Sequence, residues 1–162
     1  MVVIVMGVSG CGKTTVGRVL ADRLGCAFLD ADDFHPPENV AKMRGGVALD
    51  DHDRAGWLDR LRAEIERHLA AGTSAVLACS ALRERYRARL RHEGEPVHLA
   101  YLRGDFETIA RRLEARAGHY MPAALLCSQF ETLEEPAHGA IVVPVALPPA
   151  EAAERIANAL PP

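Results

Sequence analysis

The residues best suited to chemistry lie close to the amino terminus, in the segment GVSGCGKT over residues 7–14. This segment matches the pattern G-x-x-x-x-G-K-[ST] without a gap. Its glycines allow the backbone to wrap around phosphate oxygens, and the helix that follows adds positive potential at its amino terminus. We expect Lys13 to reach the β- and γ-phosphates and the Thr14 hydroxyl to ligate Mg²⁺. The segment therefore predicts a nucleoside triphosphate site and leaves the reaction open.

Acidic residues follow the second apolar run of the chain, in the sequence Asp30-Ala31-Asp32-Asp33. The third apolar run, 75–79, ends without an acidic residue. Residues two apart in an extended chain project to the same side, so Asp30 and Asp32 can face one cleft. One carboxylate can hold a Mg²⁺-bound water, and the other can accept a proton from an attacking hydroxyl. A solvated acidic turn is the alternative, and the phosphate-loop motif favours the functional interpretation.

Phosphoryl transfer also requires positive charge on the transferring group and exclusion of water. Arg112 and Arg116 lie four residues apart, on one face of a predicted helix. Gly118 and Pro122 bracket a segment that could hinge as a lid. A solvated basic face is an equally good interpretation from the residues alone.

Arginine is frequent elsewhere too, since only Lys13 and Lys42 among the 19 basic residues are lysine. Bias in composition explains this, yet a retained lysine hints that a compact point charge is needed. Arginines stand at every other position from Arg83 to Arg91. On a helix this spacing spreads charge around the cylinder, so we interpret most of them as solvated surface. Arg83, close to a strand end, is the exception.

Short apolar runs alternate with amphipathic stretches, which predicts strands that alternate with helices. We predict strands over residues 2–6, 27–29, 75–79, 97–102 and 140–145. Predicted helices cover residues 13–24, 37–43, 54–71, 123–130 and 149–160. Two more follow Ser80, to about residue 92, and Asp105, to about residue 116. Asp53, Ser80 and Asp105 are the predicted amino-terminal caps. Such alternation implies a parallel sheet with right-handed crossovers. The prediction is one three-layer α/β domain over 1–162.

Composition excludes several other classes of protein. A length of 162 residues, 49% hydrophobic and 25% charged, suits one folded domain. The net charge of −3 gives no bulk attraction to nucleic acid or to an anionic membrane. No apolar run reaches the roughly 18–20 residues that span a bilayer, and the apolar amino terminus lacks the basic start of a signal peptide. The four cysteines match no zinc motif, so we expect reduced thiols in a cytoplasmic protein.

Seven segments resemble those of the gluconokinases, in order and at the expected spacings from about Val3 to Pro136: GVSGCGKT, FLDADDFHPPENVAKM, LDDHDRAGWL, CSALRERYR, YLRGD, ARAGHYM and QFETLEEP. Gluconokinases use ATP to phosphorylate D-gluconate on its terminal hydroxyl, which gives 6-phosphogluconate. The resemblance implies ATP and Mg²⁺ as cofactors and a cytoplasmic homodimer. It also implies the fold of shikimate-kinase-like P-loop kinases, a five-stranded parallel sheet flanked by helices with a mobile lid over about 112–128.

The resemblance further implies roles for residues around the nucleotide. Asp30 would support Mg²⁺ together with Thr14, and Asp32 would orient or deprotonate the acceptor hydroxyl, although Asp33 leaves the choice of base open. Arg116 would touch the γ-phosphate. The residues implied to hold the nucleotide are Gly7, Val8, Ser9, Gly10, Cys11, Gly12, Lys13, Thr14, Thr15 and Arg112.

On the acceptor side, the resemblance implies that Arg54 binds the substrate carboxylate, because an arginine fork matches a carboxylate. Ser80 and Arg83 would form another wall of the pocket. The further candidates for contacts with the polyol are His35, Lys42, Gln129 and Glu131. His35 could equally cap a turn, and Glu131 could pair with a lid arginine.

Cys11 departs from the family pattern, in which serine is common at this position. A thiol at a helix amino terminus favours thiolate, which predicts inactivation by alkylation and protection by MgATP. A small residue that fills a small space is the alternative.

Two other functions remain to be weighed. Another small kinase of the same fold could act on shikimate or on a nucleoside monophosphate, but one Trp, three Tyr and four Phe offer little for stacking a second base. A non-catalytic nucleotide-binding module is the other, and the intact Lys13, Thr14, Asp30 and Asp32 argue against it.

Overall fold

The apolar run at the amino terminus forms the central strand of a five-stranded sheet. The computed structural model describes residues 1–45, 47, 49–115 and 123–161. Within them the strand order is β2-β3-β1-β4-β5, and all neighbouring strands are parallel. The strands are β1 (Val2–Met6), β2 (Ala27–Asp30), β3 (Ala75–Ala78), β4 (Val97–Arg103) and β5 (Ala140–Pro144). Every residue of β1 is buried, as expected for a strand with helices on both sides.

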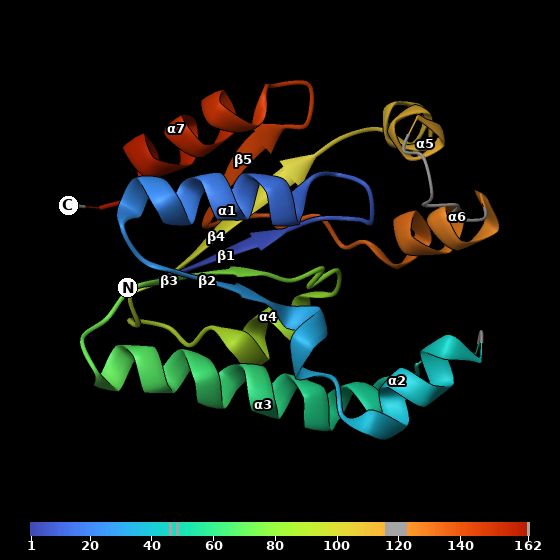
Figure 1. Ribbon diagram of the computed structural model, residues 1–162, viewed down its shortest axis with the longest axis horizontal. Helices are drawn as coiled ribbons and strands as arrows, with labels where there is room; N and C mark the ends of the chain where they lie inside the picture. The colour runs from blue at the N-terminus through green and yellow to red at the C-terminus, as the bar shows by residue number, and fades with distance from the viewer. Residues whose placement is uncertain (46, 48, 116–122, 162) are drawn as a thin grey trace.

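Helices cover both faces of this sheet and confirm the predicted three-layer α/β arrangement (Figure 1). One face carries α1 (Lys13–Leu24) and α7 (Pro149–Ala159), and the other carries α3 (Asp51–Ala70) and α4 (Glu84–Leu90). Beyond the carboxyl ends of the strands lie α2 (Pro37–Arg44), α5 (Phe106–Glu114) and α6 (Ala123–Thr132). Both chain termini lie at the opposite end of the molecule (Figure 1).

The side chains of β1 alternate between two hydrophobic cores, because successive residues of a strand point to opposite faces. Val3 and Val5 pack with Leu20 of α1 and with α5 and α7. Ile4 lies in the other core, with Leu61 and further apolar residues of α3 and α4. The two cores fix the sheet between its helical layers and thereby fix the loop that follows β1.

Two of the three predicted helix caps are wrong, and one short helix was not predicted. Asp50, rather than Asp53, caps α3; its side chain accepts from the Asp53 N–H at 2.8 Å, and the Asp53 side chain accepts from the Asp50 N–H at 3.1 Å. This capping box extends the helix by one turn beyond the predicted start. Ser80 caps no helix, since α4 begins at Glu84 after Arg83. A short 3₁₀-helix over Ala31–Phe34, capped by Asp30, follows β2 and was not predicted.

Arg87 departs from the expectation that most of the arginines after β3 are solvated. This side chain is buried, with only 4% of the residue exposed. Its guanidinium donates to the main-chain oxygens of Ala81 and Leu82 at 2.9 and 3.1 Å, and it pairs with Glu84 at 2.6 Å. A buried charge is tolerated only with such partners. Through them, Arg87 holds the loop between β3 and α4.

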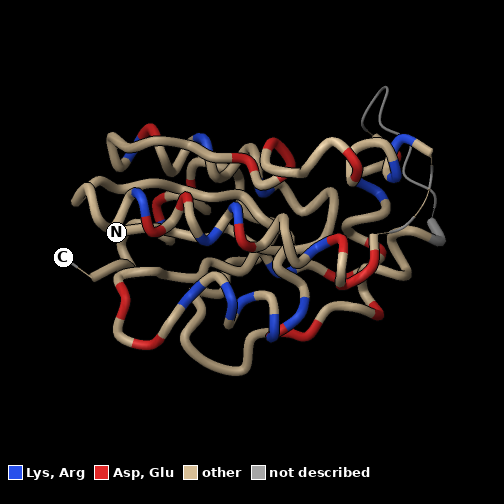
Figure 2. Tube along the Cα trace, turned by 90° about the horizontal axis from the view of Figure 1, so that it is seen from below, with Lys and Arg blue, Asp and Glu red and all other residues tan. Residues whose placement is uncertain are grey.

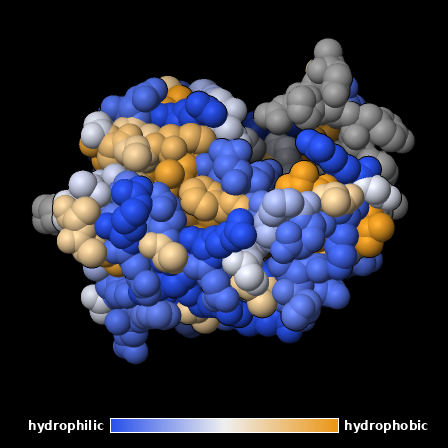
Figure 3. All heavy atoms as spheres, turned by 60° about the horizontal axis from the view of Figure 1, so that its bottom comes forward, coloured by the Kyte–Doolittle hydropathy of each residue, from blue (hydrophilic) through white to orange (hydrophobic). Residues whose placement is uncertain are grey.

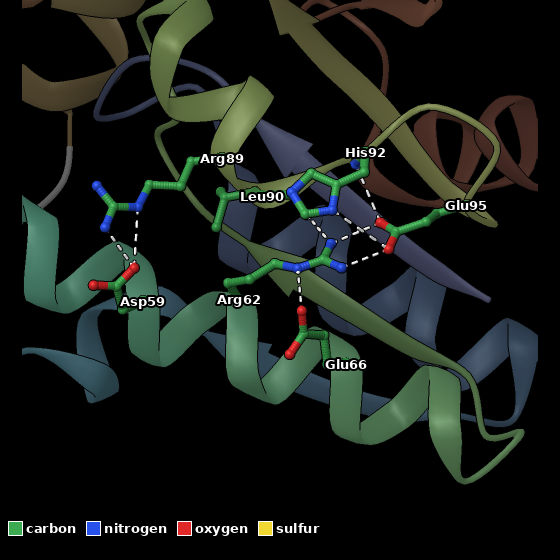
Figure 4. A network of polar contacts seen from close by, with 7 residues as sticks. All are labelled: Asp59, Arg62, Glu66, Arg89, Leu90, His92 and Glu95. Carbon is green, nitrogen blue, oxygen red and sulfur yellow. Dashed lines mark hydrogen bonds and ion pairs between the residues drawn. The ribbon is translucent and has the colours of Figure 1, made fainter.

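Charged side chains also join α3 to the turn before β4 (Figure 4). Arg62 donates to the two carboxylate oxygens of Glu95 at 2.6 and 2.5 Å, to Glu66 at 2.8 Å and to the main-chain oxygen of Leu90 at 3.2 Å. The His92 N–H donates to Glu95 at 3.1 Å. We call Arg62, Glu66, His92 and Glu95 the Arg62 network.

The surface carries charges of both signs. Acidic and basic residues are interspersed along the chain trace (Figure 2), and hydrophilic residues cover most of the face that includes the α3 side (Figure 3). Among the helices in the described ranges, none is both long and apolar enough to cross a lipid bilayer.

Candidate active site

The loop between β1 and α1 adopts a conformation that requires glycine. Gly7 and Gly10 have φ angles of 148° and 81°. A Cβ atom on Gly7 would lie 2.7 Å from the Cys11 sulfur, and one on Gly10 would lie 2.7 Å from Leu113 Cγ. Because neither position has room for a side chain, the loop closes tightly at the amino terminus of α1. This is the geometry that the sequence motif predicts for a phosphate cradle.

Lys13 folds back over this loop. Its Nζ donates to the main-chain oxygens of Gly7 and Val8, both at 3.0 Å. The ammonium group is therefore placed beside the loop by main-chain atoms, as a cation directed at bound phosphate must be.

The predicted metal ligands Thr14 and Asp30 are brought together by α1 and the end of β2. The Thr14 hydroxyl donates to Asp30 Oδ2 at 3.1 Å. The other oxygen of Asp30 accepts from the Asp32 N–H at 3.1 Å and so caps the 3₁₀-helix. Hydroxyl and carboxylate oxygens are ligands that Mg²⁺ prefers. The residues present therefore fit the metal ion that the motif implies.

Asp32 lies in an environment that favours its protonated form. Loss of solvent around the carboxyl group raises its pKa, and the negative charges of Asp30 and Asp33 raise it further. His35, when its ring is protonated, and Lys13 oppose this shift through positive charge. A carboxylate with a raised pKa binds a proton more readily, which suits a general base.

His35 is fixed as part of the wall beside Asp32. Its ring stacks on Trp57, with the ring centres 4.6 Å apart and the planes 13° from parallel. Burial lowers the pKa of His35, so the neutral ring is favoured. Trp57 is held in turn by a 2.7 Å hydrogen bond to the Ala31 oxygen. No role in the site was predicted for Trp57.

Lys42 is engaged in an ion pair between α2 and α3. Its Nζ lies 2.6 Å from Asp53 Oδ1, and this hydrogen bond raises the pKa of Lys42. The buried Asn39 connects the same helices, since its side chain donates to the Asp53 main-chain oxygen at 2.9 Å. Lys42 and Asn39 therefore set the position of α2 against α3.

Arginines from α3 and α4 gather around one carboxylate, Asp51. Arg85 Nη2 lies 2.7 Å from both Asp51 oxygens, and the Tyr86 hydroxyl donates to Oδ1 at 2.7 Å. The hydrogen bond from Tyr86, followed by the charges of Arg85, Arg83 and Arg54, holds the pKa of Asp51 below its usual range. The Arg54 guanidinium also lies 5.9 Å from the centre of the Tyr86 ring. The structure thus brings the predicted residues Arg54 and Arg83 to one place.

Two polar residues of these walls, Asn39 and Asp51, were not predicted to have a role. Both stand within the segments that carry the family resemblance, HPPENVAKM and LDDHDRAGWL. Their polar character inside those segments was the available signal. Ser80 lies between β3 and α4, where its main-chain oxygen accepts from the Gly7 N–H at 3.4 Å.

Gln129 contacts the phosphate loop. Its Oε1 accepts from the Ser9 N–H at 2.7 Å, and its Nε2 donates to Ser9 Oγ at 2.9 Å. The sequence placed Gln129 among contacts with the acceptor, whereas the structure directs its carboxamide to Ser9. Glu131, the neighbouring candidate, is exposed.

A pocket of about 240 Å³ adjoins the phosphate loop at the start of α1. Its lining includes Cys11, Thr15 and Arg112, together with the loop from Pro144 to Pro149. The Arg112 guanidinium donates to the main-chain oxygen of Val145 and so links α5 to that loop. Arg112 therefore lines the pocket beside the phosphate loop and connects it to α5. Arg116 and the centre of the predicted lid, 116–122, lie outside the described residues.

The expectation of a thiolate at Cys11 is wrong. The residue is only 2% exposed, and burial raises the pKa of its thiol. The positive charge of Lys13 and the main-chain amides act in the opposite direction but do not outweigh the loss of solvent. Cys11 is thus a small residue that fills a small space behind the loop.

Comparison with known proteins shows relatives that share most of this chain. A family model described as shikimate kinase matches residues 9–136. The thermosensitive gluconokinase of Escherichia coli K12 is 47% identical, over 82% of this chain and 71% of that protein. A crystal structure of a gluconokinase from Sinorhizobium meliloti has a TM-score of 0.85 and 41% identity, and covers 98% of this chain and 92% of that one. An unliganded sugar kinase from Janibacter has a TM-score of 0.86 and 46% identity, over 97% and 92% of the two chains.

Proposed function

The chain belongs to the shikimate kinase family and, within it, to the gluconokinases, and from this premise we propose its reaction. The γ-phosphoryl group of ATP is transferred to the 6-hydroxyl of D-gluconate, which gives 6-phosphogluconate and ADP. Membership in the family identifies the class of enzyme, a phosphotransferase with an alcohol acceptor. The roles of individual residues given below are part of the proposal.

One observation carries this proposal: Asp32 lies near enough to Lys13 of the phosphate loop and to His35 for their charges to act on it. His35 lies near enough to Arg54 for the charge of that arginine to act on its ring in turn. These four residues form a series from the phosphate cradle to the group around Asp51. A sugar acid needs such a site, with a cationic group for its carboxylate and a base for its reacting hydroxyl.

On the nucleotide side, the loop residues Gly7–Gly12 and the first turn of α1 would hold the phosphates of ATP. Lys13 would neutralise charge on the transferring group. Thr14 and Asp30 would hold the accompanying Mg²⁺, which when bound neutralises charge on the phosphates. Thr15 and Arg112 line the adjoining pocket, where the nucleoside would lie.

On the acceptor side, Arg54 would bind the carboxylate of gluconate, and Ser80 and Arg83 would form another wall of the pocket. Asp32 accepts the proton of the gluconate 6-hydroxyl. The oxygen of that hydroxyl forms a bond to the γ-phosphorus, and the bond between the γ-phosphorus and the bridging oxygen of ADP breaks. His35 presents its stacked ring to the same cleft, and Lys42 would reach the polyol only by leaving Asp53. We retain Arg116 as the residue that would contact the γ-phosphate.

The wider organisation is part of the same proposal. We propose a single kinase domain over 1–162, with a lid across about 112–128 that excludes water during transfer. The resemblance to gluconokinases supports a homodimer. Sedimentation of the purified protein over a range of concentrations would establish the oligomeric state.

The reaction is tested by measuring ADP release in a coupled assay with MgATP. The acceptors compared are gluconate, shikimate, nucleoside monophosphates and none, with Lys13→Met as the control for contaminating kinases. We expect ADP release that depends on gluconate. Release with another acceptor would reject gluconate but keep the mechanism, whereas nucleotide binding without acceptor-dependent release would indicate a binding module.

A further inference from the structure

The carboxamide of Gln129 contacts Ser9 with both of its polar atoms. Oε1 accepts from the Ser9 main-chain N–H at 2.7 Å, and Nε2 donates to the Ser9 hydroxyl at 2.9 Å. Both contacts are partly buried and join residues 120 positions apart in the sequence. A hydrogen bond from a main-chain N–H fixes the backbone itself, so Gln129 constrains the shape of the phosphate loop.

The next loop residue is fixed from a different helix. Leu113 of α5 fills the space where Gly10 would carry a Cβ atom, and only 9% of Leu113 is exposed. Consecutive residues at the tip of the loop, Ser9 and Gly10, are therefore held by α6 and α5. Contacts from two helices leave the tip little freedom, because packed interiors yield only at a cost.

The end of α6 is itself anchored on the acceptor side. The Glu134 N–H donates to the Leu82 oxygen at 2.8 Å, and the Glu134 carboxylate accepts from the Glu84 N–H at 2.7 Å. The Tyr101 hydroxyl donates to Glu135 at 3.1 Å. Gln129 thus extends from a segment that is attached to the loop between β3 and α4.

We propose that Gln129 is a positioning residue for phosphoryl transfer, which holds the tip of the phosphate loop through Ser9 rather than binding the acceptor. With the Ser9 N–H committed to Gln129 and the Cys11 N–H donating to the Val8 oxygen at 3.3 Å, phosphate oxygens must be bound by other N–H groups of the loop and of the first turn of α1. A displacement of about 1 Å at a reacting group can cost about 10²-fold in rate, so the shape of this loop matters. This inference rests on the proposed function for its kinetic readout.

Two variants remove the contact from opposite sides. Gln129→Met keeps most of the side-chain volume and loses both hydrogen bonds, while Ser9→Ala loses the hydroxyl and leaves α6 unchanged. Ser128→Ala, at an exposed position on the same helix, is the matched control. Steady-state kinetics would be measured for MgATP and for gluconate separately, together with the melting temperature and the affinity for MgADP.

We expect Gln129→Met to lower kcat/KM for MgATP by about 10-fold or more, since it removes a hydrogen bond that fixes the main chain of the loop, and small displacements at the reacting groups are costly. MgADP should bind more weakly, and the KM for gluconate should stay unchanged. Ser9→Ala should show the same pattern at smaller size, and the double variant should fall short of the product of the two effects.

A rise in the KM for gluconate with unchanged MgADP affinity would overturn the proposal and make Gln129 an acceptor contact. Unchanged values for both substrates would overturn it as well. If Gln129→Met does not fold, Gln129→Ala, which also loses both hydrogen bonds, decides on the same criteria. If the wild-type protein binds MgADP but ignores gluconate, the proposed function fails while the MgADP comparison still tests Gln129.

Discussion

The cluster around Asp32 and the Arg62 network use the same kinds of side chain in opposite ways. In the Arg62 network each carboxylate faces a cation, and the hydrogen bonds from Arg62 lower the pKa of Glu95 to about 2. At the end of β2 three aspartates stand within four residues, and the pKa of Asp32 is raised. One carboxylate is stabilised in its charged form by the fold, and the other is destabilised.

This difference separates what the fold needs from what the reaction needs. A carboxylate with a lowered pKa adds stability in its ionised form, and one with a raised pKa subtracts from it. A base must take up a proton during the reaction, so its ionised form cannot be over-stabilised. We therefore expect substitution of Asp32 to lower activity and raise stability, and substitution in the Arg62 network to lower stability and leave activity unchanged.

The largest expected effect comes from replacing Lys13. Lys13→Met should lower kcat/KM for MgATP by about 10³-fold, because cations on a transferring phosphoryl group contribute on this scale. The melting temperature should change little, since the bonds of the ammonium to described residues are those to two main-chain oxygens of the loop. Coupled-assay kinetics and thermal unfolding of the same sample would measure both. Retained turnover would remove Lys13 from the reaction.

Replacement of Asp32 tests directly whether its carboxylate serves the reaction at a cost in stability. Asp32→Asn should lower kcat by about 10²–10³-fold, within the range for loss of a general base, and leave MgADP affinity nearly unchanged. The same substitution should raise the free energy of unfolding at neutral pH, because it removes an ionised group that the site disfavours. Urea unfolding would measure that gain.

Asp33→Asn is the matched control for this variant, since it removes the neighbouring carboxylate. If Asp33→Asn lowers kcat as much and Asp32→Asn does not, the base is Asp33. A loss of stability in Asp32→Asn would contradict the assignment of Asp32 as the strained member of the cluster.

The raised pKa of Asp32 also predicts how activity depends on pH. The base must be ionised, so kcat should fall as the pH drops through its folded-state pKa, above the ordinary aspartate value of 3.8. Stability should change in the opposite direction: the free energy of unfolding should rise as Asp32 becomes protonated, because protonation removes an unfavourable negative charge. A pH profile of kcat in the wild type, and its loss of this acid limb in Asp32→Asn, would check the assignment.

Local patterns were sufficient to predict most of the fold. The run Val2–Met6 and the helix Lys13–Leu24 have the predicted bounds, because burial and helical periodicity leave their signal in adjacent residues. The helix starts at Asp50 and Glu84 were missed, since several acidic or polar residues there compete as caps. The right choice depends on which side chain reaches which N–H in the folded chain.

The site was predictable where chemistry is tied to a contiguous motif, as at Thr14 and Asp30. It was not predictable where partners lie far apart in sequence. The contact of Gln129 with Ser9 spans 120 residues, and the burial of Cys11 and Arg87 depends on packing by distant elements. Composition and spacing carry no information about such partners.

The smallest effects belong to the Arg62 network, and they concern stability alone. Glu95→Gln should lower the free energy of unfolding by about 1–2 kcal/mol, a range that allows for solvent screening of a pair that is partly exposed. This corresponds to a fall of roughly 2–8 °C in melting temperature for a domain of this size. kcat and both KM values should match the wild type, because the network lies at the turn before β4, away from the phosphate loop. A loss of activity without loss of stability would refute the division between the two regions.

The contribution of Glu95 to stability should depend on pH in the direction opposite to that of Asp32. The pKa of Glu95 in the folded protein is about 2, below the ordinary value of 4.5. Its contribution to stability is therefore complete above pH 4.5 and is lost as the pH falls toward 2. The stability difference between the wild type and Glu95→Gln should be constant near neutral pH and shrink below pH 4.5. A difference that persists down to pH 2 would mean that Glu95 contributes through packing or neutral hydrogen bonds rather than through its charge.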